Sequence, residues 1–98
     1  MGAVVGAGGG GLTAPTVGEV FVLYVDPAKK RQGIGSRLLE TMTRQQRERG
    51  ATEQWVSTVP DNEIGISFYQ KHGFEVVGAR NSYGEASDRT SLRLKRPL

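Results

Sequence analysis

The sequence has no cysteine and only one histidine, His72. The absence of thiols excludes disulfide bonds, cysteine nucleophiles and cysteine-ligated zinc, and a single histidine excludes a metal site built from several histidines. No run of 18 apolar residues occurs, so no membrane-spanning helix is predicted. The first residues also lack the basic-then-apolar order of a secretion signal. We therefore expect a cytoplasmic protein without a membrane partner or a metal site.

The charge balance is only slightly basic, with 13 Lys and Arg against 10 Asp and Glu and a net charge of +3. This balance suits a phosphorylated ligand as well as it suits nucleic acid. We do not expect nucleic acid as a partner, because the cations form no long stripe and the chain is only mildly basic. The hydrophobic fraction is 37%, which is typical of a folded chain rather than a disordered one. At this length we expect a single domain over residues 1–98.

Three parts of this domain are expected from the local sequence. Residues 1–16 predict a short strand, over residues 3–6, followed by a glycine-rich loop, because the glycines over residues 6–15 are too many to hold an element. Residues 17–79 predict the core, and residues 80–98 a polar loop followed by a final strand. Within the core, residues 17–25 (VGEVFVLYV) are nearly all apolar, which predicts a strand buried on both faces and near the centre of a sheet.

Further elements follow from hydrophobic periodicity and from the glycines that end helices. They are helices over residues 35–49 and from Asp61 or Asn62 to His72, and strands over residues 53–59, 74–79 and 90–96, with the polar loop over residues 80–88. Two strand–helix–strand crossovers predict a parallel core, and the last two strands predict an antiparallel hairpin. The fold class is therefore α/β, of the α+β type, with a mixed central sheet flanked by helices.

Residues 29–36 (KKRQGIGS) place three cations and two glycines directly before the first helix. A helix start exposes unpaired backbone N–H groups and the positive end of the helix dipole, so it attracts anions. Gly33 and Gly35 leave room for a phosphate, and Lys30 and Arg31 add positive charge. Two interpretations stay open, a pyrophosphate cradle or an ordinary exposed turn with a solvated basic face.

A second glycine pattern lies upstream, where Gly6, Gly8 and Gly11 satisfy G-x-G-x-x-G. In dinucleotide-binding folds this pattern opens a helix. Here Pro15 stands where that helix would be running, so we interpret the stretch as a loop.

Residues 18–78 resemble the GNAT superfamily of acetyl-CoA-dependent acyltransferases. Lys30, Gly33 and Gly35 are similar to the family's pyrophosphate motif, which is Arg or Gln, two residues, Gly, one residue, and Gly or Ala. Asn62, seven residues before Tyr69, and the following KHGF are similar to the family's N-x-x-A-x-x-F-Y-x-K-x-G-F. Lys30 departs from the usual Arg or Gln, and Gly65 replaces the usual Ala, which should weaken the helix slightly.

The resemblance implies a fold and an activity. The fold would be the GNAT-like acyltransferase fold, with residues 17–79 as its cofactor-binding core. The activity would be transfer of an acetyl group from acetyl-CoA to a primary amine by direct attack. The cofactor contacts implied are Leu23, Val25, Lys30, Arg31, Gln32, Gly33, Ile34, Gly35, Ser36 and Asn62. For Asn62 the alternative is a plain helix cap.

The resemblance also implies catalytic roles. Tyr69 matches the acid that protonates the leaving thiolate, and the alternative is an aromatic ring that only packs. A backbone N–H near Val25 would stabilise the oxyanion. Glu19 lies sixteen residues before Gly35, where some members carry a catalytic glutamate, and the alternative is a surface charge at a strand end. Other members use a glutamate at the position of Ser57, which cannot serve, so ordered water is a further candidate for the base.

Other polar groups have simpler interpretations. We expect His72 to be a helix C-terminal imidazole whose charge the dipole favours. Trp55 is expected in the core or on the sheet surface. Arg80, Arg89, Arg93, Lys95 and Arg96 are expected to be solvated charges.

The resemblance covers the C-terminal two-thirds of a family domain, so the N-terminal elements of a complete member are expected to be missing. Uncovered sheet edges and apolar surface favour association, so we expect a homo-oligomer, most simply a dimer. Two functions stay open. One is an N-acetyltransferase that acts on a small or peptidic amine, and the other is a CoA-binding or regulatory module without acyl transfer.

Overall fold

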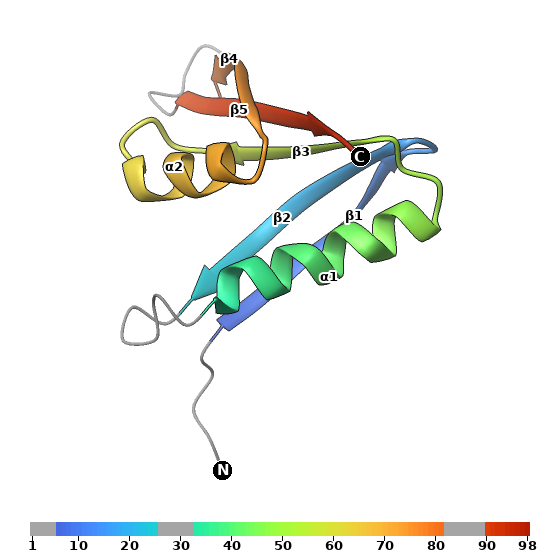
Figure 1. Ribbon diagram of the computed structural model, residues 1–98. Helices are drawn as coiled ribbons and strands as arrows, with labels where there is room; N and C mark the ends of the chain where they lie inside the picture. Colours follow the sequence, from blue (N-terminus) through green and yellow to red (C-terminus); the bar gives the residue numbers. More distant parts are fainter. Residues whose placement is uncertain (1–5, 26–32, 82–89) are drawn as a thin grey trace. The chain divides into compact units, whose positions relative to one another are not determined.

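The computed structural model describes residues 6–25, 33–81 and 90–98. The described elements are β1 (Gly6–Ala14), β2 (Val17–Val25), α1 (Ile34–Glu48), β3 (Glu53–Thr58), α2 (Glu63–Lys71), β4 (Glu75–Asn81) and β5 (Thr90–Pro97), shown in Figure 1. The strands are hydrogen-bonded in the order β1-β2-β3-β5-β4. This mixed sheet with two helices confirms the predicted fold class. Among the described helices, none is long and apolar enough to cross a membrane.

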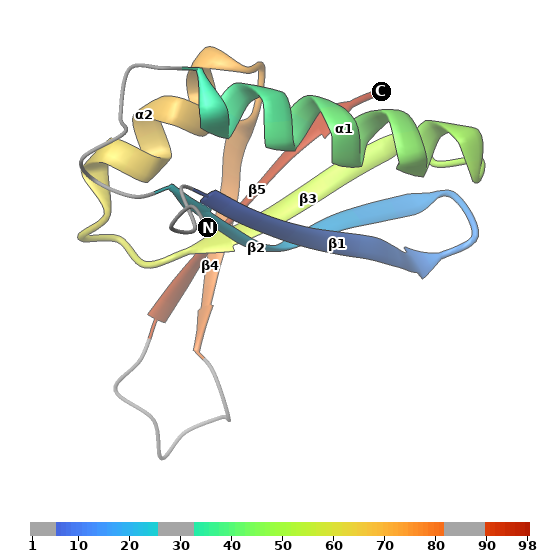
Figure 2. The same cartoon turned by 90° about the horizontal axis from the view of Figure 1, so that it is seen from below.

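The chain divides into two compact units, Met1–Gln54 with Leu98, and Trp55–Pro97. In the first unit, β1 and β2 form an antiparallel hairpin that runs from Gly6 opposite Val25 to Ala14 opposite Val17. Helix α1 lies along this hairpin, as Figure 2 shows, and contacts both of its strands. Leu39 and Met42 of α1 are buried against it.

The prediction of a glycine-rich loop over residues 6–15 is wrong, because most of this stretch forms β1. A strand at the edge of a sheet is held by its ladder hydrogen bonds, so it needs few side chains of its own. Its glycines instead allow α1 to come close. A Cβ added at Gly8 would lie 3.1 Å from the Cε atom of Met42. The strand predicted over residues 3–6 lies almost wholly outside the described residues.

The prediction that residues 17–25 form a strand buried on both faces is also wrong. Val20 is 3% exposed, but Phe21 is 61% and Val22 is 55% exposed. The strand contains a bulge, since Gly9 pairs with Val22 and Gly10 with Val20, which leaves Phe21 as an extra residue. β2 is an interior strand, but β3 is the third of the five strands.

The second unit contains α2, the end of β3 and the antiparallel β4–β5 hairpin, in which Glu75 pairs with Lys95 and Asn81 with Thr90. Its buried apolar side chains are those of Val56, Tyr69, Phe74 and Leu94. Both predicted helices are confirmed, and Gly50 and Gly73, with φ of 101° and 94°, follow their ends as expected. The polar loop predicted over residues 80–88 is wrong for Arg80 and Asn81, because β4 extends to Asn81. Residues 82–88 lie outside the described residues.

We predict that Gly18→Ala lowers the free energy of unfolding by about 1–3 kcal/mol, the usual cost of overpacking. The added methyl group would lie 2.7 Å from the side-chain Cδ of Gln46, which is buried and hydrogen-bonded. Gly9→Ala is the matched control, because its Cβ would meet nothing within 4 Å, and it should stay within about 0.5 kcal/mol of the parent. Urea unfolding measures both variants. A Gly18→Ala protein as stable as the parent would contradict the close packing described here.

Candidate functional site

The start of α1 is the position at which the sequence predicts an anion site. Gly33 is the N-cap residue, with φ 73° and ψ 14°, a left-handed conformation that glycine adopts without strain. It has no side chain to cap the helix, and the first turn of α1 contains no acidic residue. The positive end of the helix dipole is therefore not compensated by the residues of its own first turn. A Cβ added at Gly33 would meet nothing within 4 Å, so the space beside it is open.

The structure locates seven of the ten predicted cofactor contacts. Gly33, Ile34, Gly35 and Ser36 form the N-cap and first turn of α1. Leu23 is half-buried on β2, and Val25 is the last residue of that strand. Asn62 is the N-cap of α2. The other three predicted contacts, Lys30, Arg31 and Gln32, lie outside the described residues.

Glu19 lies near the start of β2, opposite Gly11, and is half-buried. Its carbonyl oxygen accepts a hydrogen bond from Nε2 of Gln46 at 3.0 Å. The bulge at Phe21 follows two residues later. The candidate base therefore lies between the two register shifts of the β1–β2 pairing, and the side chain of Gln46 is hydrogen-bonded to its backbone. Its role as base stays a prediction.

Asn62 caps α2, as one of the two interpretations of the sequence predicted. Its Oδ1 accepts the backbone N–H of Gly65 at 3.0 Å, and its Nδ2 donates to Oγ1 of Thr58 at 3.0 Å. A Cβ added at Gly65 would lie 2.8 Å from Cγ of Asn62. The glycine that departs from the motif therefore makes room for the cap. A contact with a cofactor stays a prediction for Asn62.

Tyr69 is buried, with 8% of its surface exposed. Its ring makes edge contacts with Phe68 and Phe74, each at 5.3 Å between centroids. Burial raises the pKa of the Tyr69 phenol above its usual value, so the hydroxyl is protonated at neutral pH. The ring of Tyr69 therefore packs in the core of the second unit. A protonated phenol is also what a general acid requires, and the acid role of Tyr69 stays a prediction.

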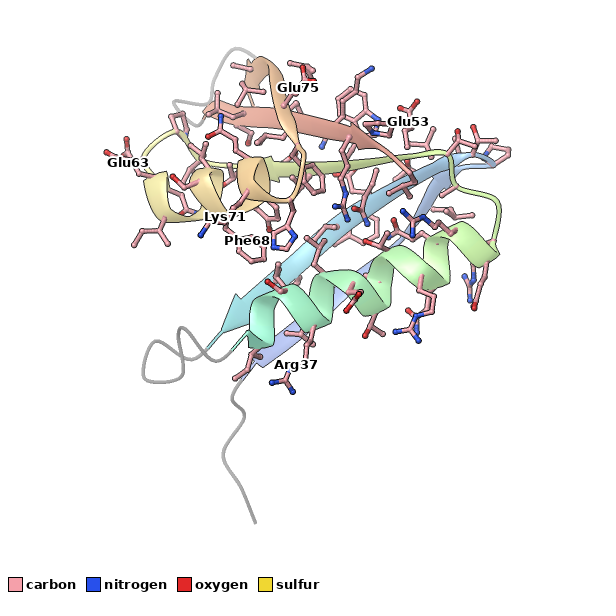
Figure 3. The ribbon with its side chains drawn as sticks, in the orientation of Figure 1. Arg37, Glu53, Glu63, Phe68, Lys71 and Glu75 are labelled. Carbon is pink, nitrogen blue, oxygen red and sulfur yellow. The ribbon has the colours of Figure 1, made fainter. Side chains whose placement is uncertain are left out.

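His72 is the C-cap residue of α2, as predicted, but its charged form is not favoured. Burial, together with the positive charges of Arg96 and Lys71, lowers the pKa of the His72 imidazole. Arg96 provides the cation at this helix end instead. Its Nη1 donates to the carbonyl oxygen of His72 at 2.7 Å, and its guanidinium lies 4.7 Å from the centroid of the Phe74 ring. Phe68 and Lys71, which also lie on α2 in the second unit, are labelled in Figure 3.

Three cations on β5 are not simply solvated, which corrects the prediction for Arg93, Lys95 and Arg96. Arg93 and Lys95 lie over the ring of Trp55, at 4.9 Å and 5.5 Å from its centroid. Arg93 also donates to Oγ of Ser57. The position where some family members carry a glutamate is therefore occupied by a hydroxyl group that contacts a guanidinium.

Comparison with known proteins identifies the family. A family model described as the acetyltransferase (GNAT) family matches residues 1–74. The chain belongs to this family. The ribosomal protein bS18-alanine N-acetyltransferase of Escherichia coli is 32% identical over 69 residues, which are 70% of this chain and 47% of that protein. N-alpha-acetyltransferase RimI of Mycobacterium tuberculosis is 35% identical over 86 residues, which are 88% of this chain and 52% of that protein.

Solved structures agree with this assignment. Ard1 from Thermoplasma volcanium matches with a TM-score of 0.86 and 26% identity, over 98% of this chain and 64% of that one. A nourseothricin acetyltransferase matches with a TM-score of 0.85 and 27% identity, over 95% and 57%. The predicted GNAT fold is therefore confirmed. The chain spans about half the length of the two relatives named above.

We predict that His72 makes this GNAT domain less stable in mild acid. Because the pKa of His72 is lowered in the folded state, the unfolded chain takes up its proton first as the pH falls. The stability that comes from neutral His72 is fully present above the ordinary histidine pKa of about 6.5 and is lost as the pH falls through the lowered folded-state value. The melting temperature of His72→Gln should therefore fall less than that of the parent between about pH 7.5 and pH 5. Superimposable pH profiles of the two proteins would contradict the prediction.

Proposed function

We propose that the chain transfers an acetyl group from acetyl-CoA to a primary amine by direct attack. The observation that carries the proposal is the open start of α1, where Gly33, the first glycine of the family's pyrophosphate motif, is the left-handed N-cap residue. The backbone N–H groups of this first turn would hold the pyrophosphate. The cations Lys30 and Arg31 precede it in the same motif, together with Gln32. The backbone at Leu23 and Val25 would pair with the pantetheine arm, and Asn62 is a further proposed contact.

The proposed reaction has four steps. The amine gives a proton to Glu19, or to an ordered water, and its nitrogen attacks the thioester carbonyl carbon. A backbone N–H near Val25 donates to the oxyanion that forms. The C–S bond then breaks, and the Tyr69 phenol gives its proton to the departing thiolate. Because the raised pKa of Tyr69 keeps the phenol protonated, the proton is present when the bond breaks.

The acceptor class follows from the relatives. The names of the Escherichia coli and Mycobacterium tuberculosis relatives describe acetylation of an alanine of a ribosomal protein and of an α-amino group. We therefore propose the N-terminal amine of a peptide that begins with alanine as the first acceptor to test, and a small free amine as the second.

A second candidate function is a CoA-binding or regulatory module without acyl transfer. The burial of Tyr69 beside Phe68 and Phe74 is consistent with it, because a phenol that serves only to pack would have the same contacts.

Self-association is a separate proposal. It is supported by the exposed Phe21 and Val22 and by β1, which ends the strand order and so offers an unpaired edge. A cytoplasmic location is likewise proposed, on the composition of the chain.

We predict that Tyr69→Phe lowers turnover by roughly 10²–10⁴-fold, the usual contribution of a general acid. The affinity for acetyl-CoA should change little, because the variant keeps the ring that packs on Phe68 and Phe74. The assay is thiol release from acetyl-CoA with the alanine peptide, with acetyl-CoA hydrolysis as background.

Phe74→Leu is the matched control, since it loosens the packing around Tyr69 but keeps the hydroxyl. It should lower stability more than turnover. Near-normal turnover in Tyr69→Phe would show that the hydroxyl is not the acid. A parent chain that binds acetyl-CoA but neither transfers nor hydrolyses it would favour the second candidate function.

A further inference from the structure

Gln46 is a polar side chain in the core of the first unit. It lies on α1 and is 3% exposed. Its Nε2 donates to the carbonyl oxygen of Glu19 on β2, and its Oε1 accepts from Nε2 of Gln54 on β3, both at 3.0 Å. Because the oxygen of the amide already has a donor, the nitrogen must face β2. Gln46 thus contacts the backbone of the residue proposed as the base.

Glycines keep open the space through which Gln46 reaches the hairpin. A Cβ added at Gly10 would lie 2.9 Å from Nε2 of Gln46, and one added at Gly18 would lie 2.7 Å from its Cδ. These glycines flank the amide from the two strands of the hairpin. The amide therefore fits this stretch of β1 and β2 closely, and a larger residue at either position would displace it.

Further buried groups hold the amide in place. Nε2 of Gln54 also donates to Oγ1 of Thr43 at 3.1 Å, and Oγ1 of Thr43 donates to the carbonyl oxygen of Leu39 at 2.7 Å. Within the described part of the chain, every buried side-chain nitrogen and oxygen has a hydrogen-bond partner. A fully satisfied buried network is rigid, so it can transmit the position of α1 to β2.

The bond to Glu19 lies where the register of β2 changes. Before the bulge Glu19 pairs with Gly11 and Val20 with Gly10, and after it Val22 pairs with Gly9. A shift of one residue in a strand turns each side chain to the opposite face of the sheet. A hydrogen bond to the carbonyl of Glu19 fixes the strand just before this shift, and with it the face on which the Glu19 carboxylate lies.

We propose that Gln46 is a positioning residue for Glu19, because its amide anchors the backbone from which the proposed general base projects. The inference rests on the proposed function, in which Glu19 takes the proton of the amine. Gln46 itself touches no reacting atom. It acts through the backbone of β2, so its effect on turnover requires the Glu19 carboxylate.

A double-mutant cycle tests this dependence in the full chain. Gln46→Met removes the donor at similar side-chain length and should lower kcat by about 10- to 100-fold, as expected for a misplaced catalytic group. KM for acetyl-CoA should stay within about twofold, since the first turn of α1 is unchanged. In a Glu19→Gln background, which keeps the carbonyl but not the base, Gln46→Met should lower kcat no further.

Thr43→Val is the control for stability. Like Gln46→Met it takes one hydrogen bond from Nε2 of Gln54, but it leaves the bond between Gln46 and Glu19 intact. It should lower the melting temperature comparably and keep kcat within about threefold of the parent. Gln46→Ala is the second variant if Gln46→Met does not fold, because Gln46 lines a surface hollow beside Gly10, Leu12 and Met42 where water can replace the lost side chain.

Different results would contradict the positioning role of Gln46, the role of Glu19 as base, or the proposed function. If Gln46→Met lowers kcat by the same factor in the parent and in the Glu19→Gln background, Gln46 only stabilises the fold. A normal kcat in Gln46→Met would show the same. An unchanged kcat in Glu19→Gln alone would show that Glu19 is not the base. It would overturn this inference but not the proposed transferase activity. A parent that releases no thiol from acetyl-CoA with the alanine peptide would overturn the proposed function itself, and the inference with it.

Discussion

The close approach of α1 to the β1–β2 hairpin is the constraint on which the rest of the first unit depends. It requires small residues on the hairpin, and Gly8, Gly10 and Gly18 provide them. It also brings the Gln46 amide to the backbone of β2. Because β2 ends at Val25 and α1 begins at Ile34, beside the glycines of the motif, this packing sets where the strand ends and the helix begins. The candidate cofactor site follows from it.

The N-termini of α1 and α2 differ in their capping residue and in the charge of their first turn. α2 begins with the Asn62 cap, whose side chain accepts the backbone N–H of Gly65, and has Glu63 in its first turn, so a carboxylate opposes its dipole. α1 begins with Gly33 and has no acidic residue in its first turn. For this reason we propose that a negatively charged ligand binds at the start of α1 rather than that of α2. At the other end of α2, Arg96 takes the place that a charged His72 would have filled.

Features that depend on local sequence could be predicted. The helices were identified from apolar spacing, and their ends from Gly50 and Gly73, both of which have positive φ. The two motifs predicted the family and the Asn62 cap. Sequence reasoning missed one indication in the second motif. Gly65 stands in place of the usual alanine because the Asn62 side chain occupies the space where a Cβ would lie.

Features that depend on distant contacts could not be predicted. β1 has the composition of a loop and is a strand because β2 supplies its hydrogen bonds. The bulge at Phe21 exposes apolar side chains that an uninterrupted apolar run predicts to be buried. From the sequence, Arg93 and Arg96 look like surface charges. In the structure their guanidinium groups lie over the rings of Trp55 and Phe74. Gln46 carries no signal of its own, since its partners lie 8 and 27 residues away in the sequence.

Calorimetric titration of acetyl-CoA into the chain and into Gly33→Asn tests the central claim, that the start of α1 is a pyrophosphate site. Asparagine tolerates the left-handed backbone of Gly33 and has open space around it, so the variant should fold while its side chain obstructs the ligand. We expect binding to a single site in the parent and an affinity at least about tenfold lower in the variant, a difference of about 1.4 kcal/mol. A folded parent that binds no acetyl-CoA, or a folded Gly33→Asn with the affinity of the parent, would contradict it.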